Sequence, residues 1–300
     1  MTPSTPEKNT AVPSEADAST SLPTRVGVLG GGRMGAGIAH GFLIKGADVL
    51  IVERDAPSAE AARERVATAV GKSIDRGLAG AVEDHLAHLT VSTDYADFGD
   101  RELVVEAVPE IWDLKVSSLQ AVEAELGSEA VLASNTSSLS MSGLAGHLAR
   151  PGSFLGLHFF NPVPASTLIE VVIAEQTAPA LVEKARGWVA GLGKTAVVVN
   201  DAPGFASSRL GVMLAVEAMR MLEEGVASAE DIDNAMVLGY KHPTGPLKTT
   251  DLVGLDVRLG IAEYLAEQLG ERFAPPAILR RKVERGDLGR KTGQGFYDWS

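Results

Sequence analysis

The chain has 300 residues, 45% of them hydrophobic, and a formal net charge of −12 at pH 7. This length predicts about two domains with substantial cores, and the acidic balance argues against a nucleic-acid partner held by bulk charge. The absence of cysteine excludes disulfides, thiol catalysis and cysteine-ligated metal sites, and it fits a reducing, cytoplasmic location. No apolar run approaches the roughly 18 residues of a transmembrane helix, so we expect no membrane partner.

The first 24 residues are rich in Pro, Ser, Thr and Ala and include the acids Glu7, Glu15 and Asp17. They have neither the apolar segment of a secretory signal nor the arginine-rich, acid-poor composition of a mitochondrial transit peptide. Residues 1–24 are therefore predicted to form a disordered tail.

A glycine-rich loop follows the first predicted strand, Arg25–Leu29, and satisfies the pattern G-x-G-x-x-G through Gly30, Gly32 and Gly35. The first glycine allows a tight turn, the second lets the backbone approach a pyrophosphate, and the third lets the next helix pack closely on its strand. Unpaired N–H groups at the start of that helix, around Met34, would point at the phosphates. The motif predicts dinucleotide binding, against the alternative of a plain helix-capping loop.

The residue after the second predicted strand, 47–52, indicates which dinucleotide is bound. Glu53 follows Gly35 by about 18 residues, where an acid can hold the adenosine ribose hydroxyls. Its charge would repel a 2′-phosphate, which favours NAD over NADP, although the adjacent Arg54 weakens the preference. We expect NAD as the cofactor.

Strands and helices alternate through the first two-thirds of the chain. Further strands are predicted at 89–92, 103–107, 131–133 and 197–199, and helices at 59–76 and 112–125. The first of these helices has a basic face, most simply a solvated one, formed by Arg63, Arg65, Lys72 and Arg76. The alternation predicts an α/β domain over residues 25–200, with a Rossmann-type, doubly wound and mostly parallel sheet.

Polar residues cluster where the strand at 131–133 ends, in the run Ser134-Asn135-Thr136-Ser137-Ser138. Ligands bind at the carboxyl ends of the strands in an open α/β sheet. The same residues could serve only as helix caps, and the sequence leaves both interpretations equally open.

A histidine interrupts the apolar run 154–160, which predicts a buried strand that ends at Asn161 and Pro162. A second apolar run, Leu168–Ile173, contains one carboxylate, Glu170. If the two runs pair, His158 and Glu170 meet, and a neutral imidazole oriented by a buried carboxylate is a general acid/base. A core histidine bonded to the backbone is the alternative.

Composition and periodicity change at Asp201, and no convincing strand follows. Residues 201–300 are predicted to form an all-α C-terminal domain. Its expected helices are 205–224, 228–239, 256–269 and 277–285. Gly225 suits the position just after the first of them. Apolar residues on that helix, including Leu210 and Leu214, suit a core or a subunit interface.

Five segments form a combination far more specific than the glycine loop alone. They are Gly30-x-Gly32-x-x-Gly35, Ser134-Asn135-Thr136-Ser137-Ser138, His158-Phe159-Phe160-Asn161-Pro162, Pro203-Gly204-Phe205 and Gly289-Arg290-Lys291-Thr292-Gly293-Gln294-Gly295-Phe296-Tyr297. In this order they resemble the 3-hydroxyacyl-CoA dehydrogenase family, most closely its stand-alone bacterial 3-hydroxybutyryl-CoA members. The resemblance implies NAD-dependent oxidation of an (S)-3-hydroxyacyl-CoA substrate to a 3-oxoacyl-CoA, by a homodimer joined through the helical domain.

The resemblance also implies roles for single residues. His158 is the acid/base, Glu170 holds it, and Ser137 contacts both substrate and nicotinamide. The residues expected at the cofactor are Glu110, Lys115, Asn161 and Lys291, of which Lys115 also contacts substrate. Arg76 is the nearest match to a basic residue that binds a CoA phosphate in some relatives.

One position departs from the family pattern. The family usually has asparagine in P-G-F-x-x-N-R, near the substrate and the catalytic pair, and here Ser208 replaces it. A serine hydroxyl can still donate a hydrogen bond, but it reaches less far and lacks the amide. Ser208 is therefore expected to assist Ser137 at the reacting oxygen, and the substrate contact is the part placed in doubt.

Two other functions remain as alternatives. One is a sugar-acid dehydrogenase of the gulonate type, which shares the fold but differs around the histidine motif. The other is a non-catalytic, crystallin-like NAD-binding protein, which would bind NADH without turning over any acyl-CoA. The joint presence of His158, Glu170 and Ser137 argues against the second.

Overall fold

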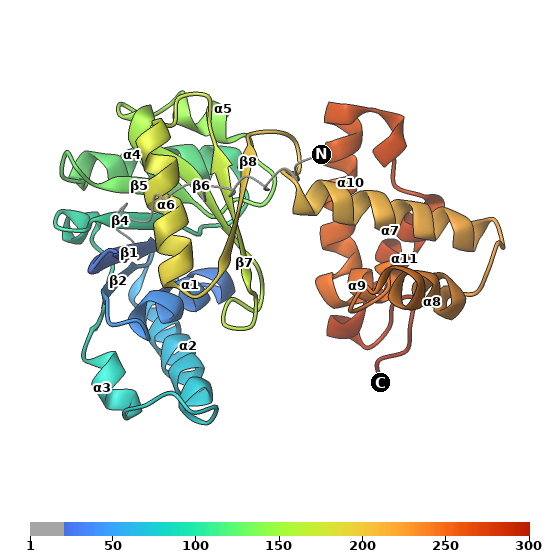
Figure 1. Ribbon diagram of the computed structural model, residues 1–300, viewed down its shortest axis with the longest axis horizontal. Helices are drawn as coiled ribbons and strands as arrows, with labels where there is room; N and C mark the ends of the chain where they lie inside the picture. The colour runs from blue at the N-terminus through green and yellow to red at the C-terminus, as the bar shows by residue number, and fades with distance from the viewer. Residues whose placement is uncertain (1–20) are drawn as a thin grey trace, which may run out of the picture.

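The computed structural model describes residues 21–300, which form an α/β part and a separate group of helices (Figure 1). The strands of the described chain are β1 (Arg25–Leu29), β2 (Asp48–Val52), β3 (Leu89–Ser92), β4 (Leu103–Glu106), β5 (Val131–Ser134), β6 (Phe154–Phe159), β7 (Leu168–Ile173) and β8 (Thr195–Asn200). They form a single sheet in the order β3-β2-β1-β4-β5-β6-β7-β8.

The sheet is parallel from β3 through β6, and β7 then pairs antiparallel with β6. Parallel neighbours need a crossover, usually a helix, whereas the antiparallel pair β6–β7 needs only a loop. The loop begins at Phe160 and brings β7 back so that His158 and Glu170 are register partners. The predicted pairing of these two runs is therefore confirmed.

Helices cover both faces of the sheet. They are α1 (Arg33–Leu43), α2 (Ala56–Ile74), α3 (Val82–Leu86), α4 (Trp112–Glu125), α5 (Met141–Ala145) and α6 (Pro179–Gly191). Side chains of α1, α2 and α6 share one core with Val49 and Ile51 of β2. Side chains of α4 and α5 share the other core with Leu50 and Val52 of the same strand. Alternate residues of one strand thus enter two cores, as a doubly wound sheet requires, and the predicted fold class is confirmed.

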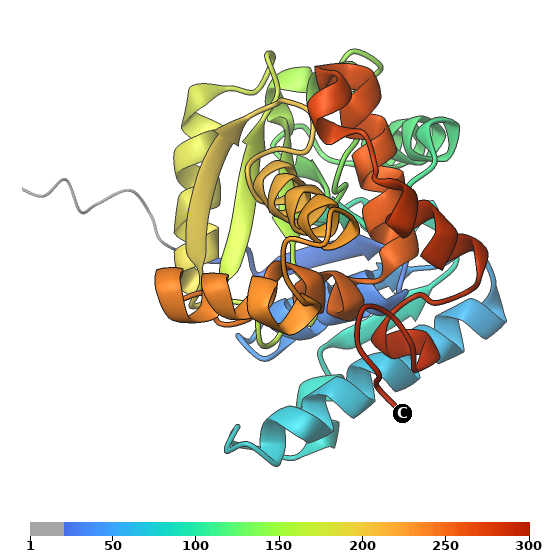
Figure 2. The ribbon, with the colours of Figure 1, turned by 90° about the vertical axis from the view of Figure 1, so that its right-hand side faces the viewer.

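The C-terminal helices form the second part, with its own small cores. They are α7 (Ser207–Glu223), α8 (Ala229–Tyr240), α9 (Pro246–Val253), α10 (Leu255–Leu269) and α11 (Ala277–Glu284). Figure 2, viewed from their side of the molecule, shows these helices in front of the sheet. Extended pairing within the described residues 201–300 is limited to isolated bridges involving Gln294, so the expected absence of strands there is confirmed.

Several helical details differ from the sequence-based expectations. Helices α3, α5, α6 and α9 were not predicted. Helices α6 and α9 begin with a proline in the first turn, where its missing N–H costs nothing. Helix α8 does not stop at Gly239 but continues to Tyr240, because Lys241 takes the left-handed conformation and ends it. Gly225, with a φ of 70°, does follow α7 as predicted.

Leu210 and Leu214 of α7 were expected in a core or in a subunit interface, and the structure places them outside the core. Leu210 and Leu214 are 65% and 40% exposed. The buried stripe of α7 consists of Val212, Ala215, Val216, Ala218 and Met219. The large leucines were the stronger sequence signal, yet the small residues face the core, because α9, α10 and α11 pack closely on that side.

The predicted disordered tail lies mostly outside the described residues. Its last residues pack on the α/β domain: Pro23 is buried, and Leu22 contacts Gly191 at the end of α6. Ordered contacts therefore begin before Arg25. None of the helices within residues 21–300 combines the length and hydropathy needed to cross a lipid bilayer.

Candidate active site

The glycine loop has the tight turn at Gly30 and the close helix packing at Gly35 that its spacing predicted. Gly30 has a φ of 88°, a conformation that favours glycine. A Cβ atom on Gly35 would lie 1.8 Å from the carbonyl oxygen of Gly30, so α1 packs against the turn too closely for any side chain. A Cβ atom on Gly32 would meet nothing within 4 Å. The loop is thus closed toward the protein and open on the side where a pyrophosphate would approach the N-terminus of α1.

Glu53 lies against this loop. Its Oε1 accepts a hydrogen bond of 2.7 Å from the backbone N–H of Gly31, and its Oε2 accepts one of 3.1 Å from its neighbour Arg54. The guanidinium of Arg54 turns instead to Asp55 and is largely exposed. The acid is therefore beside the loop, where ribose hydroxyls would reach it.

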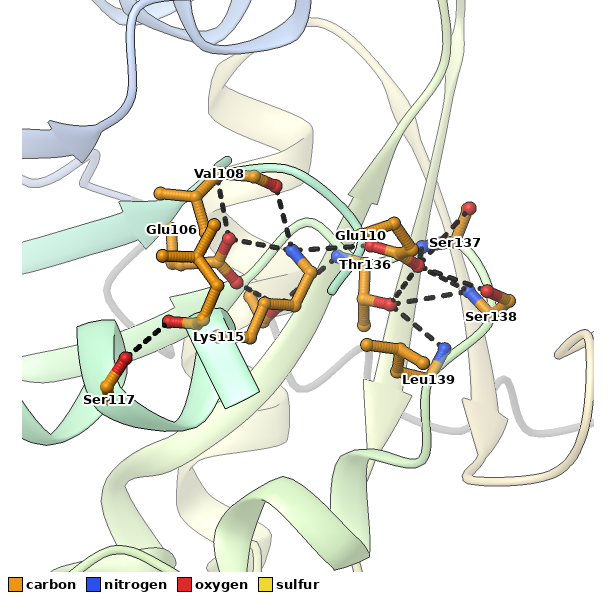
Figure 3. A network of polar contacts seen from close by, with 11 residues as sticks. Glu106, Val108, Glu110, Lys115, Ser117, Thr136, Ser137, Ser138 and Leu139 are labelled. Atoms are coloured by element: carbon orange, nitrogen blue, oxygen red, sulfur yellow. Dashed lines mark hydrogen bonds and ion pairs between the residues drawn. The ribbon is translucent and has the colours of Figure 1, made fainter. Parts of the chain in front are cut away.

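A buried ion pair lies beneath the ends of β4 and β5 (Figure 3). The Lys115 ammonium, 1% exposed, lies 2.7 Å from Oε1 of Glu106, the last residue of β4. Ser134, at the end of β5, donates a 2.6 Å hydrogen bond to Glu106 Oε2, and the N–H of Val108 donates to Oε1. Lys115, expected to touch cofactor and substrate, is instead enclosed by protein groups and supports the two strand ends from below.

Glu110 connects this ion pair to the polar run at residues 134–138, which we call the serine run. Its Oε2 lies 3.3 Å from the Lys115 ammonium, and its Oε1 accepts hydrogen bonds of 2.9 and 3.1 Å from the N–H groups of Ser137 and Ser138. Figure 3 shows the carboxylate inside the turn that these serines form. Burial of the Glu110 carboxyl acts to raise its pKa, but Lys115, Thr136 and Ser137 outweigh burial and hold the pKa below its ordinary value.

His158 and Glu170 form a buried pair across β6 and β7. His158 Nδ1 lies 2.7 Å from Glu170 Oε2, and the two residues are 6% and 0% exposed. The imidazole ring also packs on Phe160 and Phe205, with centroids 4.3 and 5.8 Å away. Within residues 21–300, His158 Nε2 has no hydrogen-bond partner, and it is not among the fully buried nitrogens.

Glu170 collects donors from the start of the helical part as well. Its Oε1 accepts the N–H groups of Ala206 and Ser207 at 3.1 and 2.8 Å, and its Oε2 accepts the Ser207 hydroxyl at 2.8 Å. Burial acts to raise the pKa of Glu170, but the hydrogen bonds from His158 and Ser207 outweigh it, so the pKa is lowered. An ionised carboxylate can only accept, so Nδ1 of His158 carries the proton and Nε2 of the neutral ring is the acceptor.

The remaining expected residues are less closely gathered. Within the described chain, neither Ser208 nor the exposed Asn161 makes a side-chain hydrogen bond. Met34 packs against the core under the loop. Arg76 lies just beyond the far end of α2, a helix of 19 residues and roughly 28 Å whose near end follows Glu53. Lys291 is bonded to Asp256 of α10 through both carboxylate oxygens, each at 2.6 Å.

Two residues of this site, Glu106 and Ser207, were not predicted from the sequence. Nothing in the local pattern distinguishes the hydroxyl of Ser207 from that of Ser208. Glu106 carried a usable signal, since a charged residue ends an otherwise apolar buried strand.

Comparison with known proteins assigns both parts of the chain. The family model described as 3-hydroxyacyl-CoA dehydrogenase, NAD binding domain, matches residues 25–202. The model described as 3-hydroxyacyl-CoA dehydrogenase, C-terminal domain, matches residues 204–299.

Similar proteins match over almost their whole length. The probable 3-hydroxybutyryl-CoA dehydrogenase of Deinococcus radiodurans is 39% identical over 277 residues, which covers 92% of this chain and 100% of that protein. The crystal structure of FadB2 from Mycobacterium tuberculosis has a TM-score of 0.89 at 38% identity and covers 93% of this chain and 100% of its own. That of (S)-3-hydroxybutyryl-CoA dehydrogenase PaaH1 from Ralstonia eutropha has a TM-score of 0.88 at 36% identity, with coverage of 93% and 99%. The chain therefore belongs to the 3-hydroxyacyl-CoA dehydrogenase family, and it is an NAD-dependent oxidoreductase, as its glycine loop and ordered motifs predicted.

Proposed function

We propose that the protein catalyses the reversible oxidation of a short-chain (S)-3-hydroxyacyl-CoA, 3-hydroxybutanoyl-CoA, to the 3-oxoacyl-CoA. The observation that carries the proposal is the buried His158–Glu170 pair, with Nδ1 and Oε2 2.7 Å apart and Nε2 left unbonded among the described residues. The names of the similar proteins from D. radiodurans and R. eutropha support the short acyl chain.

The pair supplies the proton transfer. In oxidation, His158 Nε2 accepts the proton of the substrate hydroxyl, and in reduction it returns that proton. Glu170 keeps the ring in the required tautomer and stabilises the imidazolium as it forms, because its charge lies against Nδ1. NAD, when bound, supplies the acceptor for the hydride that leaves C3 of the substrate.

The serine run orients the substrate in this proposal. The backbone N–H groups of Ser137 and Ser138 donate hydrogen bonds to Glu110, so the turn is ordered before any ligand binds. Ser137 hydrogen-bonds the reacting oxygen, with Ser208 assisting. Glu53 binds the adenosine ribose, and Asn161 lies beside the nicotinamide.

The decisive experiment is a His158→Gln variant, assayed with acetoacetyl-CoA by the absorbance of NADH and then NADPH. We expect kcat to fall by about a hundredfold or more, the usual contribution of general acid/base catalysis, with the Kd for NADH nearly unchanged. His147→Gln, an exposed histidine outside the site, is the matched control and should keep wild-type turnover. Retention of most turnover by His158→Gln would contradict the assignment.

The same assay separates the alternatives. Consumption of NADH but not NADPH supports Glu53 as the selecting residue, whereas a preference for NADPH would keep the reaction and refute that role. Turnover of a sugar acid but of no acyl-CoA would favour the gulonate-type enzyme. Binding of NADH without turnover of either would favour the non-catalytic protein.

We propose in addition that the protein is a homodimer joined through the helical domain. Exposed apolar residues lie on α7, α9 and α10, three helices that pack on one another: Leu210, Leu214, Leu252, Val253 and Val257. Arg258 of α10 is only 8% exposed, and among residues 21–300 its Nε finds no hydrogen-bond partner.

A further inference from the structure

We propose that Ser207 is a positioning residue that sets the strength of the bond between His158 and Glu170. Its hydroxyl donates to Oε2 of Glu170, the same oxygen that accepts from His158 Nδ1. This inference rests on the proposed acid/base role of His158. It concerns a side chain one residue before the position where the family pattern has its asparagine.

The Ser207 hydroxyl acts across the boundary between the two parts of the chain. Ser207 is the first residue of α7, and the helix has no side-chain N-cap. The Ser207 hydroxyl donates to Glu170, a carboxylate of the sheet, and not to a group of its own helix. The backbone N–H groups of Ala206 and Ser207 bond Glu170 Oε1, so the N-terminus of a 17-residue helix faces the buried charge. Hydrogen bonds and the helix dipole both stabilise the ionised form of Glu170.

Two donors compete for one oxygen. A hydrogen bond from Ser207 withdraws charge from Oε2, and Oε2 then attracts the imidazolium of His158 less strongly. Without the hydroxyl, the bond to Nδ1 becomes the only one on Oε2, and the imidazolium is stabilised. A variant lacking the hydroxyl therefore holds the catalytic proton more tightly.

Other charged groups around the pair belong to separate clusters. Glu110 is paired with Lys115 after β4, and Asp201, before α7, accepts from Ser140 and Ser142. On α10, Tyr264 has a pKa raised first by burial and then by Asp201. Arg258 of α10 is also packed on α7 near this point, with its guanidinium against Gly211, one turn beyond Ser207. None of these groups bonds Glu170 within the described chain, which leaves His158 and Ser207 as its side-chain partners.

The test is the pair Ser207→Thr and Ser207→Val, which have nearly the same shape and differ in the hydroxyl. The measurement is kcat/KM against pH in both directions of the reaction. For Ser207→Val, we expect the acid limb of the oxidation profile to move up by roughly half to one pH unit, the equivalent of one side-chain hydrogen bond. Plateau turnover should change only a few-fold, and Ser207→Thr should restore the wild-type profile.

Controls separate this effect from a structural one and from the proposed dyad. Ser117→Ala removes a serine that bonds only carbonyls of its own helix, and it should leave the profile in place. A fall in thermal stability of Ser207→Val with an unshifted limb would overturn the positioning role. ¹⁵N chemical shifts of His158 across the same pH range give a readout independent of turnover. If His158→Gln retains turnover, the dyad fails; if it is inactive and Ser207→Val is unshifted, only the present inference fails.

Discussion

At the scale of single residues, the site is organised by acids that accept backbone N–H groups from neighbouring loops. Glu53 accepts from the glycine loop, Glu110 from the serine run, and Glu170 from the start of α7. Each of these carboxylates thereby holds a segment that is distant from it in the sequence. Charge-assisted bonds of this kind are stronger than neutral ones, so the loops are ordered before a ligand binds.

His40 is a second buried histidine, and it is expected to make stability depend on pH. Its Nε2 bonds Ser73, and among the described residues its Nδ1 has no partner. Burial, followed by the charges of His85 and Lys194, lowers the pKa of His40 from 6.5 to about 4. Between pH 6.5 and about 4, His40 is therefore protonated in the unfolded chain and neutral in the folded chain. The stability that the neutral, buried His40 contributes is present above pH 6.5 and is lost as the pH falls toward 4.

The variant His40→Gln tests this, because glutamine can keep a bond to Ser73 without titrating. Between pH 7 and pH 4.5, the free energy of unfolding of the variant should fall by roughly 1–3 kcal/mol less than that of the wild type. Urea titrations at several pH values measure this, with the exposed His147→Gln as the matched control. Parallel losses in the variant and the wild type would show that His40 does not titrate on unfolding.

At the scale of elements, two glycines of the loop differ in what requires them. The packing of α1 requires Gly35, whereas Gly32 is expected to be required only for cofactor binding. Gly35→Ala would force a Cβ atom to 1.8 Å from a carbonyl oxygen, so α1 would have to move off its strand. We expect it to destabilise the protein by several kcal/mol.

Gly32→Ala is the matched substitution in the same loop. Gly32 has an ordinary φ of −62° and open space around its Cβ position. The protein should keep its thermal stability and lose affinity for NADH by about tenfold or more, because the methyl group stands where the pyrophosphate approaches. Calorimetry and NADH titration of both variants check this, and wild-type affinity in folded Gly32→Ala would exclude a pyrophosphate at this loop.

The closing segment 289–299 is held by one buried aspartate. Asp251 of α9 accepts the N–H groups of Phe296 and Tyr297 and the indole N–H of Trp299, each at 2.8 Å. A Cβ atom on Gly295 would lie within 2.3 Å of that carboxylate, which explains the glycine. The segment is thus bound to α9, while Lys291 points to Asp256.

We expect Asp251→Ala to lower the free energy of unfolding by about 3 kcal/mol, since it leaves three donors unpaired. Lys291→Ala removes a half-exposed ion pair and should cost less than about 1 kcal/mol. Thermal melts compare the two variants. A weaker Kd for NADH in Lys291→Ala would support its expected cofactor role, and an unchanged Kd would assign this residue to the helical domain alone.

At the scale of the whole molecule, the helical part exposes several large apolar side chains to solvent. The proposed association with a second copy rests on the large exposed side chains of three packed helices. The two small cores of this part, one of them formed by Val212, Val216, Ala262, Leu265 and Phe273, leave those leucines and valines uncovered.

In the proposed homodimer, Leu210→Lys should separate the two copies into monomers, measured by sedimentation equilibrium. Val226→Lys replaces another exposed apolar residue, 60% exposed and outside these three helices, and it should leave the dimer intact. A wild-type protein that sediments as a monomer at micromolar concentration would refute the proposed assembly.

The sequence by itself determined the features that depend on near neighbours in the chain or on a strict period. Alternating apolar residues identified the strands, the three glycines identified the turn, and two apolar runs around Asn161 and Pro162 predicted that His158 and Glu170 would meet. The ordered motifs identified the family. All of these signals can be read from the sequence alone, because strand periodicity and turn chemistry depend on residues close together in the chain.

Only the tertiary structure decided which side chains meet across elements. The direction in which α7 leaves its turn places the Ser207 hydroxyl on Glu170 and leaves Ser208 without a side-chain bond among the described residues. The packing of α4 on β4 buries Lys115 beneath the site it was expected to line. Packing by small residues on α7 turned Leu210 outward. These outcomes depend on the angles and distances between elements, which no local pattern encodes.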